Sequence, residues 1–345
     1  MHHLSYCLRK ESWKDSYKGK QVHTRTRVYL STCLPHTMKL LITGASGLLG
    51  INLAMEAMRE HEVIGVDRGK LKSAPFQVLE ADLRHGNAMN SMIDASRPEW
   101  LINCAALADL EQCEEHPDLA RILNAEIPGE LARLCAKKDI RFVHISTDAV
   151  FDGTKEGIYT EEDEPSPPGI YSQTKLDGER VVGQVNPQAI IARVNFFGWS
   201  LGGQRSLGEF FVHNLSEGKN VNGFTDVLFC PMLVNHTARL LLEMLQRDLS
   251  GLYHVVGAQA MSKYQFGVEV ARTFGLREHL ISPKSVLSSS LTAKRSHNLW
   301  LSTHKLSTDL RHEIPSFSTG LAEFYTQFQQ GYPQKIRSYQ HLAAF

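Results

Sequence analysis

The chain has 345 residues, of which 42% are hydrophobic and 21% are charged, so it can bury a large core and is not a disordered polymer. Its 25 glycines and 13 prolines exclude collagen-like and proline-rich architectures. Thirty-seven Lys and Arg residues balance 37 Asp and Glu residues, and this formal net charge of zero argues against a general nucleic-acid binder.

Cysteine and histidine usage gives no sign of disulfides or metal sites. The six cysteines form no CxxC pair and no other zinc-site spacing, and the sixteen histidines include no HExxH motif. No apolar run approaches the length of about 18 residues that a membrane span needs, and the first residues lack the apolar region of a secretory signal. We therefore expect a cytoplasmic protein with no bound metal, no membrane segment and no nucleic-acid partner.

Residues 1–37 differ from the rest of the chain. They carry seven Lys or Arg residues, only two acidic residues and no sustained apolar period. We interpret them as a basic leader, and three explanations stay open: a wrongly assigned start codon, a disordered tail, or a transit peptide. Without the leader, 30 basic and 35 acidic residues remain, so the part that we expect to fold is mildly acidic.

From residue 39 onward, short apolar runs alternate with segments of helical length. The apolar runs cover residues 40–43, 63–66, 100–104, 142–146 and 189–194, and helical segments cover 48–60, 116–137 and 171–184. Near-continuously apolar strands that alternate with helices predict a parallel sheet covered on both faces. We therefore predict a doubly wound α/β fold of the Rossmann type, with an NAD(P)-binding domain over residues 38–198.

After residue 198 the alternation becomes irregular. Helical periods lie near 206–217, 235–247 and 262–274, separated by loops rich in Ser, Gly and Asn. We predict that residues 199–345 form mainly a smaller substrate-binding lobe, with some elements returning to the sheet. A substrate pocket would lie where this lobe closes over the sheet.

A glycine-rich turn, TGASGLLG, follows the first apolar run and opens the first helical segment. Gly44 and Gly47 would let the backbone approach a pyrophosphate at the helix N-terminus, and Gly50 would allow close packing of helix on strand. Asp67 ends the second run, where its carboxylate would accept hydrogen bonds from an adenosine ribose. Because this carboxylate would repel a 2′-phosphate, we expect NAD(H) to be preferred, while the neighbouring Arg68 leaves NADP(H) open.

A tyrosine and a lysine four residues apart, Tyr171 and Lys175, lie on one face of the helical segment 171–184. We expect the Lys175 ammonium to lower the pKa of Tyr171, so that the tyrosine can exchange a proton with a substrate oxygen. An isolated pair of this kind is usually a surface feature. Thr147 favours a catalytic interpretation, because a hydroxyl at the end of its strand would lie at the carboxyl edge of the sheet, beside the cofactor crevice.

These motifs together resemble the extended short-chain dehydrogenase/reductase superfamily. The resemblance rests on the TGxxGxxG turn, the Asn-Cys-Ala-Ala strand end at 103–106, the hydroxyl of Thr147 and the YxxxK pair. More narrowly, HISTDAVFDG at 144–153 and residues 295–306 are similar to the dTDP-4-dehydrorhamnose reductase family. The resemblance covers roughly residues 38–330 and implies an NAD(P)-dependent reductase that acts on a keto group of a sugar nucleotide.

The resemblance also implies roles for matching residues. Tyr171 would donate a proton to the ketone oxygen, Thr147 would donate a hydrogen bond to it, and Lys175 would tune Tyr171 and hold the nicotinamide ribose. Asp148 and Arg295 would contact the substrate. The implied cofactor-binding residues are Gly44, Ser46, Gly47 and Leu48 at the pyrophosphate, Asp67 at the adenosine ribose, Asp82 and Leu83 at the adenine, Cys104, Ala105 and Ala106 beneath the nicotinamide and its ribose, Asn195 after the strand at 189–194, and Tyr171 and Lys175 themselves.

Departures from the family pattern fall on the substrate side. Ala149 stands where the family usually has tyrosine, and the family signatures at 226–232 and 295–301 are kept only in part. The reaction class is therefore better supported than the substrate. A dehydratase is disfavoured, because elimination needs a base at the position of Ala149.

The same resemblance leaves two alternative functions open and also implies an oligomeric state. A nucleotide-sugar epimerase would use the same triad. The family also resembles the regulatory β subunit of methionine adenosyltransferase, which binds a dinucleotide and serves a partner enzyme. The amphipathic segment 117–137 corresponds to a helix that forms dimers in extended family members, which implies a homodimer.

Overall fold

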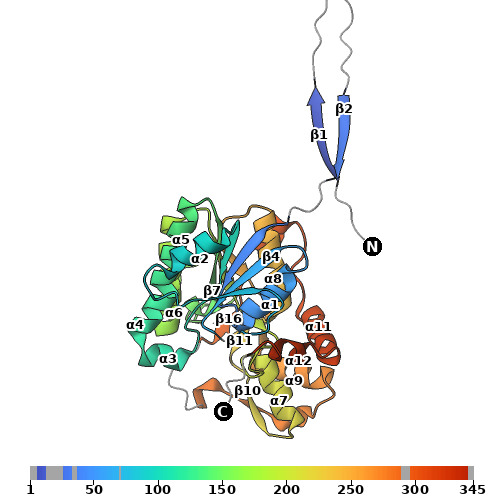
Figure 1. Ribbon diagram of the computed structural model, residues 1–345. Helices are drawn as coiled ribbons and strands as arrows, with labels where there is room; N and C mark the ends of the chain where they lie inside the picture. Colours follow the sequence, from blue (N-terminus) through green and yellow to red (C-terminus); the bar gives the residue numbers. More distant parts are fainter. Residues whose placement is uncertain (1–5, 13–25, 33–36, 70, 289–295, 341–345) are drawn as a thin grey trace, which may run out of the picture. The chain divides into compact units, whose positions relative to one another are not determined.

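The computed structural model describes residues 6–12, 26–32, 37–69, 71–288 and 296–340. The chain divides into two compact units, Met1–Met38 and Lys39–Phe345. In the first unit, strand β1 (Tyr6–Ser12) pairs antiparallel with β2 (Thr26–Thr32) (Figure 1). The predicted basic leader thus contains two strands, and the rest of it lies mostly outside the described residues.

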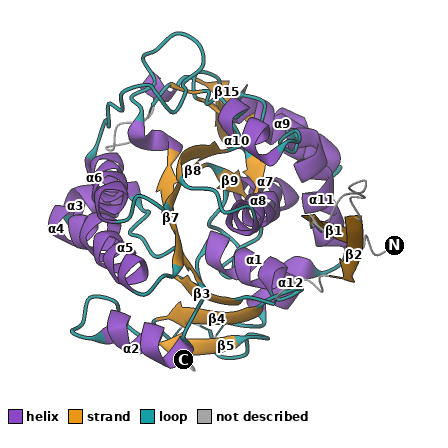
Figure 2. Ribbon diagram, turned by 90° about the horizontal axis from the view of Figure 1, so that it is seen from above, coloured by secondary structure: helices purple, strands orange, loops and turns teal. Residues whose placement is uncertain are grey.

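Within its described residues, the second unit is built around a seven-stranded parallel sheet (Figure 2). The strands are, in spatial order, β13 (Gly251–Val255), β8 (Ile190–Val194), β7 (Arg141–Thr147), β6 (Trp100–Asn103), β3 (Lys39–Thr43), β4 (Glu62–Asp67) and β5 (Gln77–Glu80). The chain reverses its direction of winding between β3 and β6, so the ends of these two strands form the crevice where doubly wound sheets bind ligands. The predicted doubly wound α/β fold is confirmed.

Burial on both faces explains why the central strands are apolar runs. Leu40, Leu41 and Ile42 of β3 are all completely buried, although successive side chains of a strand point to opposite faces of the sheet. Such a strand needs a helical layer on each side.

Helices supply both layers (Figure 2). One face is covered by α2 (Ala88–Ser96), α5 (Ile127–Lys137) and α6 (Ile170–Val185), and beside α6 lie α3 (Leu110–Glu115) and α4 (Pro117–Arg121). The other face is covered by α1 (Leu48–Ala57) and α8 (Val234–Gln246). The predicted helix over 116–137 is interrupted by a π-helical turn, Ile122–Glu126, between α4 and α5. The sheet therefore lies in the middle of a three-layer arrangement.

The remaining elements come from the C-terminal part of the chain. Their helices are α7 (Leu207–Ser216), α9 (Lys263–Thr273), α10 (His304–Leu310), α11 (Phe317–Gln329) and α12 (Tyr332–Arg337). Their short strands pair as β9 (Phe196–Phe197) with β12 (Met232–Leu233), β10 (Val221–Phe224) with β15 (Ile281–Lys284), and β11 (Leu228–Phe229) with both β14 (Met261–Ser262) and β16 (Asn298–Leu299). The same part also contributes α8 and β13 to the main sheet and its cover.

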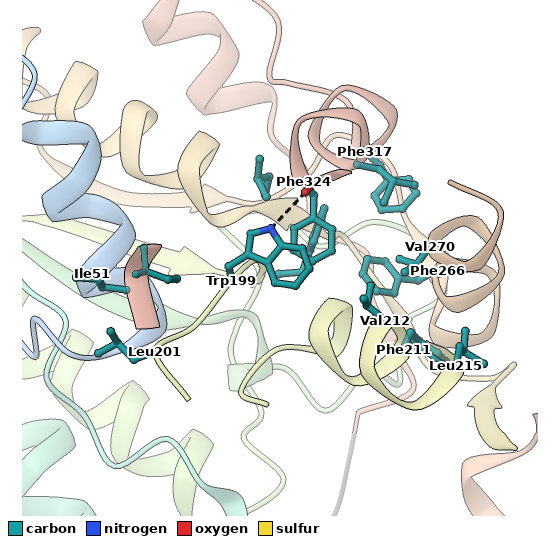
Figure 3. Close-up of a cluster of buried hydrophobic side chains, with 14 of the residues drawn as sticks. Ile51, Trp199, Leu201, Phe211, Val212, Leu215, Phe266, Val270, Phe317 and Phe324 are labelled. Atoms are coloured by element: carbon teal, nitrogen blue, oxygen red, sulfur yellow. Dashed lines mark hydrogen bonds between the residues drawn. The ribbon is translucent and has the colours of Figure 1, made fainter. Parts of the chain in front are cut away.

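An aromatic core joins this C-terminal part to α1 (Figure 3). Trp199 stacks on Phe324 with ring centroids 4.1 Å apart, and its indole Nε1 donates a hydrogen bond to the Phe324 carbonyl oxygen at 3.2 Å. The same buried cluster includes Ile51 of α1, and Asn52 Nδ2 donates to the Trp199 carbonyl oxygen at 2.9 Å. The sheet and the C-terminal part therefore share one continuous core.

A buried carboxylate on α1 fixes this helix to α8. Glu56 is only 6% exposed, and it accepts hydrogen bonds from Asn235 Nδ2 at 2.9 Å and Arg239 Nε at 3.1 Å, both on α8. Arg239 also donates to Glu323 on α11.

No helix in the described residues is long and apolar enough to cross a membrane.

Candidate active site

The turn after β3 has a backbone that only glycine can follow. Gly44 has φ of +65°, and a methyl group on it would lie 2.8 Å from the backbone nitrogen of Ala105. A methyl group on Gly50 would lie 2.2 Å from the Gly44 carbonyl oxygen. These two glycines therefore let α1 and the loop after β6 approach the turn closely.

Helix α1 begins directly at this turn and presents its N-terminus to the crevice. Gly47 is the N-cap with extended backbone, and within the described residues no side chain caps the helix and no acidic residue lies in its first turn. The first amide groups of a helix have no partner within the helix and attract anions. A diphosphate fits this cradle, which contains the predicted Ser46 and Leu48.

The predicted adenosine side lies at the ends of β4 and β5. Asp67 ends β4 and is 5% exposed, and its carbonyl oxygen accepts a hydrogen bond from the Ala81 amide at 3.0 Å. Asp82 comes next, but both of its carboxylate oxygens accept hydrogen bonds from Arg84 Nε at 3.0 Å, which holds the pKa of Asp82 well below its usual range. The Leu83 side chain packs in the core beneath α2 and α5.

Buried hydrogen bonds connect the ends of β3, β6 and β7. Thr43 Oγ1 donates to Asn103 Oδ1 at 2.5 Å, and Asn103 Nδ2 lies 3.3 Å from His144 Nδ1. The Cys104 amide donates to the Thr43 carbonyl oxygen at 3.2 Å. Residues 104–106, the predicted floor beneath the nicotinamide, are thereby fixed against the glycine turn. Burial raises the pKa of the Cys104 thiol to about 12, which suits a packing surface and not a nucleophile.

The predicted triad comes together at the end of β7. Thr147 is the last residue of that strand, Tyr171 lies in the first turn of α6, and Lys175 follows one turn later. The Tyr171 hydroxyl lies next to the Thr147 side chain. Lys175 is 2% exposed, and its Nζ donates to the Ile145 carbonyl oxygen at 2.5 Å.

The pKa of Tyr171 moves in the opposite direction to the prediction. Burial raises it to about 12, although the neighbouring Thr147 hydroxyl lowers it, and the nearby Asp148 carboxyl raises it further. The predicted lowering by Lys175 is not found; the Lys175 ammonium instead donates its hydrogen bond to the Ile145 carbonyl oxygen. Burial also lowers the pKa of Lys175 to about 8, opposed by Glu179. Near neutral pH, Tyr171 keeps its proton and Lys175 is mostly charged.

The predicted substrate-binding residue Asp148 lies beside the triad and is buried. Thr147 Oγ1 donates to Asp148 Oδ1 at 3.2 Å, and Asn195 Nδ2 donates to Asp148 Oδ2. Burial raises the pKa of Asp148 to about 6, while Lys263 at the start of α9 lowers it. The predicted Asn195 thus contacts Asp148, whereas Arg295 lies outside the described residues.

A buried ion pair on the side of α6 that faces β7 and β8 was not predicted. Glu179 on α6 and Arg193 on β8 are 6% and 2% exposed, and Arg193 Nη2 lies 2.8 Å from Glu179 Oε2. Ser146 Oγ donates to Glu179 Oε1 at 2.5 Å. The pair fixes α6 to β7 and β8. An arginine within an otherwise apolar strand was the sequence signal.

Asn124 is a second residue that the sequence analysis missed. It lies in the π-helical turn, where its Oδ1 accepts from the Leu107 amide at 2.9 Å and its Nδ2 donates to the Leu107 carbonyl oxygen at 3.0 Å. The same Nδ2 lies 3.1 Å from Thr174 Oγ1 on α6. Asn124 therefore connects the loop after β6 to α6.

The part of the chain that the structure describes contains no cluster of side chains suited to bind a metal ion. No group of three or more His, Cys, Asp or Glu residues there could hold a metal ion. The described cysteines 104, 113, 135 and 230 are free thiols.

Comparison with known proteins agrees with this geometry. Residues 38–330 match the RmlD substrate binding domain family. The probable low-salt glycan biosynthesis reductase Agl14 of Haloferax volcanii is 31% identical over 296 residues, 84% of this chain and 98% of that protein. Methionine adenosyltransferase 2 subunit beta of Mus musculus is 31% identical over 306 residues, 83% of this chain and 86% of that protein. A crystal structure of a dTDP-4-dehydrorhamnose reductase from Clostridium acetobutylicum is 27% identical with a TM-score of 0.72, over 85% of this chain and 100% of that chain.

Proposed function

The chain belongs to the RmlD substrate binding domain family of extended short-chain dehydrogenases/reductases, and on this basis we propose that it is an NAD(P)-dependent reductase of a keto group on a sugar nucleotide. The observation that carries the proposal is the placement of Tyr171 next to Thr147, with buried Lys175 one turn away, at the sheet edge that also holds the glycine turn. Together they supply a proton donor next to a site for a reduced dinucleotide.

The division of the chain follows from this assignment. Residues 38–198 would bind the dinucleotide, with its diphosphate at the turn Gly44–Leu48, its adenosine ribose at Asp67 and its nicotinamide above residues 104–106. Residues 199–345 would complete the substrate site. This is supported by Lys263 of α9, whose charge lowers the pKa of Asp148. When bound, the reduced nicotinamide supplies the hydride that no protein side chain can provide.

The protein's own groups supply the proton. Tyr171 is protonated near neutral pH and would donate its proton to the ketone oxygen as the ketone carbon is reduced. Thr147 would hold that oxygen by a hydrogen bond. The Lys175 ammonium would stabilise the phenolate that Tyr171 leaves behind, and Asp148 would accept a hydrogen bond from a sugar hydroxyl. The product is an alcohol, and solvent returns the proton to Tyr171.

The test is a turnover screen with one active-site variant as its control. The purified protein is given NADH or NADPH with a panel of keto sugar nucleotides, and oxidation of the cofactor is followed by its absorbance. We expect turnover with at least one of them, and a loss of about 10²–10⁴-fold in kcat in Tyr171→Phe, because that variant lacks the proton. Cofactor binding should be nearly unchanged in the variant. Normal turnover by Tyr171→Phe would contradict the mechanism.

We also propose that Asp67 makes NADH the preferred cofactor. Removing a charge-assisted hydrogen bond costs about 1.5–3 kcal/mol, so Asp67→Ala should lower kcat/KM for NADH by about tenfold or more. It should also improve kcat/KM for NADPH, because a repulsion is removed. An unchanged ratio of the two values would remove Asp67 from the explanation of cofactor choice.

A regulatory role is the second candidate, because the mouse methionine adenosyltransferase β subunit is as similar to this chain as the glycan reductase is. Such a protein would bind a dinucleotide and form a stoichiometric complex with a methionine adenosyltransferase. Complex formation in size-exclusion chromatography, with no cofactor oxidation on any keto sugar nucleotide, would favour this candidate. An epimerase would instead convert one sugar nucleotide into another without net cofactor consumption, which NMR of the sugar would detect.

A cytoplasmic homodimer completes the proposal. Its support is the family resemblance of the segment 117–137, where Leu119, Ile122 and Leu123 remain partly exposed on α4 and the π-helical turn. Sedimentation equilibrium of the wild-type protein and of Leu119→Glu should show a dimer and a monomer, respectively.

A further inference from the structure

The first turn of the catalytic helix α6 has no cap from its own N-cap residue. The N-cap is Gly169, which has no side chain, and Tyr171 is only the second residue of the helix. The first amides of a helix need partners from elsewhere. The direction in which Tyr171 points depends on how this turn is fixed.

Glu114, at the end of α3, supplies one of these partners across 56 residues of sequence. Its Oε1 accepts a hydrogen bond from the Ile170 amide at 2.8 Å. A methyl group on Gly169 would lie 2.7 Å from the same oxygen, so in Gly169→Ala the Glu114 carboxylate would have to shift away from its present position. The backbone of Gly169 is extended, a conformation that alanine adopts freely.

Helix α3 is itself fixed to Leu107, the residue that directly follows the predicted cofactor floor. Cys113 Sγ, next to Glu114, lies 3.4 Å from the Leu107 carbonyl oxygen, and Leu107 is held by two hydrogen bonds to Asn124. Asn124 in turn contacts Thr174 Oγ1, whose hydroxyl donates to the Tyr171 carbonyl oxygen at 3.0 Å. Two contacts therefore join the loop after β6 to the helix turn that carries Tyr171.

We propose that Glu114 is a positioning residue for Tyr171: it fixes the first turn of α6 to the segment that would lie beneath the nicotinamide. This inference rests on the proposed reductase function. A carboxylate at a helix N-terminus also interacts favourably with the helix dipole, so charge and hydrogen bond act together.

Two variants remove the contact from opposite sides. Glu114→Ala removes the acceptor, and Gly169→Ala displaces it without changing its charge. Each should lower kcat about tenfold with little change in KM for the cofactor, because small misplacement of a proton donor slows the chemical step. The double variant should be no slower than the slower single variant, since both act on one contact.

Two further variants separate positioning from a general loss of structure. Glu114→Gln keeps an acceptor oxygen and should recover most of the activity. Glu115→Ala removes the next carboxylate of α3, which is also exposed, and should leave kcat unchanged. Hydrogen exchange of the wild-type and variant chains should show faster exchange of residues 170–173 in Glu114→Ala and Gly169→Ala, and in neither of the other two.

The results separate this inference from the function on which it rests. Wild-type turnover with an unchanged kcat in Glu114→Ala, or additive losses in the double variant, would overturn the inference and leave the reductase standing. A wild-type protein without turnover on any keto sugar nucleotide would overturn both, and the exchange data would then show only whether the contact exists.

Discussion

The buried pair of Glu179 and Arg193 allows a quantitative prediction about stability. Arg193→Met would leave the Glu179 carboxylate buried with only the Ser146 hydroxyl as donor, and Glu179→Leu would leave a buried guanidinium. Breaking a buried pair by removing one partner costs about 3–5 kcal/mol. For a folding unit of about 300 residues the unfolding entropy is about 0.6 kcal/mol/K, so each single variant should lose roughly 5–8 °C in Tm.

The double variant Glu179→Leu/Arg193→Met should recover most of this loss. Replacing both partners of a buried pair by apolar side chains is often neutral or stabilising, although here the Ser146 hydroxyl loses its acceptor at a cost of about 1–3 kcal/mol. Its Tm should therefore lie within about 5 °C of the wild type and above that of both single variants. Calorimetry and urea unfolding followed by circular dichroism measure these differences.

An exposed pair provides the control. Lys138 Nζ lies 2.8 Å from Asp94 Oδ1, but the two side chains are 35% and 65% exposed, so Lys138→Met should cost less than about 1 kcal/mol. If the losses of the two buried single variants simply add in the double variant, Glu179 and Arg193 do not act as a unit, and the reasoning is refuted.

Two further predictions concern the glycine turn and Asp148. Gly50→Ala should destabilise the protein by several kcal/mol and weaken cofactor binding, because its methyl group meets the Gly44 carbonyl oxygen. The control Gly202→Ala has open space for the methyl group and should be nearly neutral. Equal urea midpoints for the two variants would contradict this prediction. Since the pKa of Asp148 is raised from 3.8 to about 6, its stabilising contribution is fully present below about pH 4 and is lost as the pH rises through about 6. Asp148→Asn should therefore gain stability relative to the wild type between about pH 4 and pH 8, by roughly 3 kcal/mol or less, and a pH-independent difference in urea midpoints would sink the assignment.

The parts of the fold that the sequence predicted are those with strong burial on both faces. The five apolar runs became β3, β4, β6, β7 and β8 with boundaries shifted by one residue at most. Strand β5 was missed because it lies at the edge of the sheet and its side chains are partly or fully exposed, so it has no apolar run. Strand β13 was missed because it follows a long irregular stretch that gives no alternation.

The candidate site divides in the same way between local and long-range features. The glycine turn and the Tyr171–Lys175 pair are visible because their residues are close in sequence. The pairing of Glu179 with Arg193 joins two different elements, and the π-helical turn at Asn124 leaves no mark on the helical period. The direction of the Tyr171 pKa was wrong because spacing shows which groups are neighbours, whereas burial, which here outweighs them, appears only in the fold.

The return of α8 and β13 to the main sheet has a consequence for how this chain is made. Once residues 38–198 have left the ribosome, the glycine turn, Thr147, Tyr171 and Lys175 have all been synthesised. At that stage β8 is still an open edge of the sheet, and α1 still lacks its cover. The sheet of this N-terminal half is complete only after residue 255 has emerged, since β13 ends there. Cutting the gene at residue 198 would therefore give an aggregation-prone fragment and not a small working cofactor-binding protein.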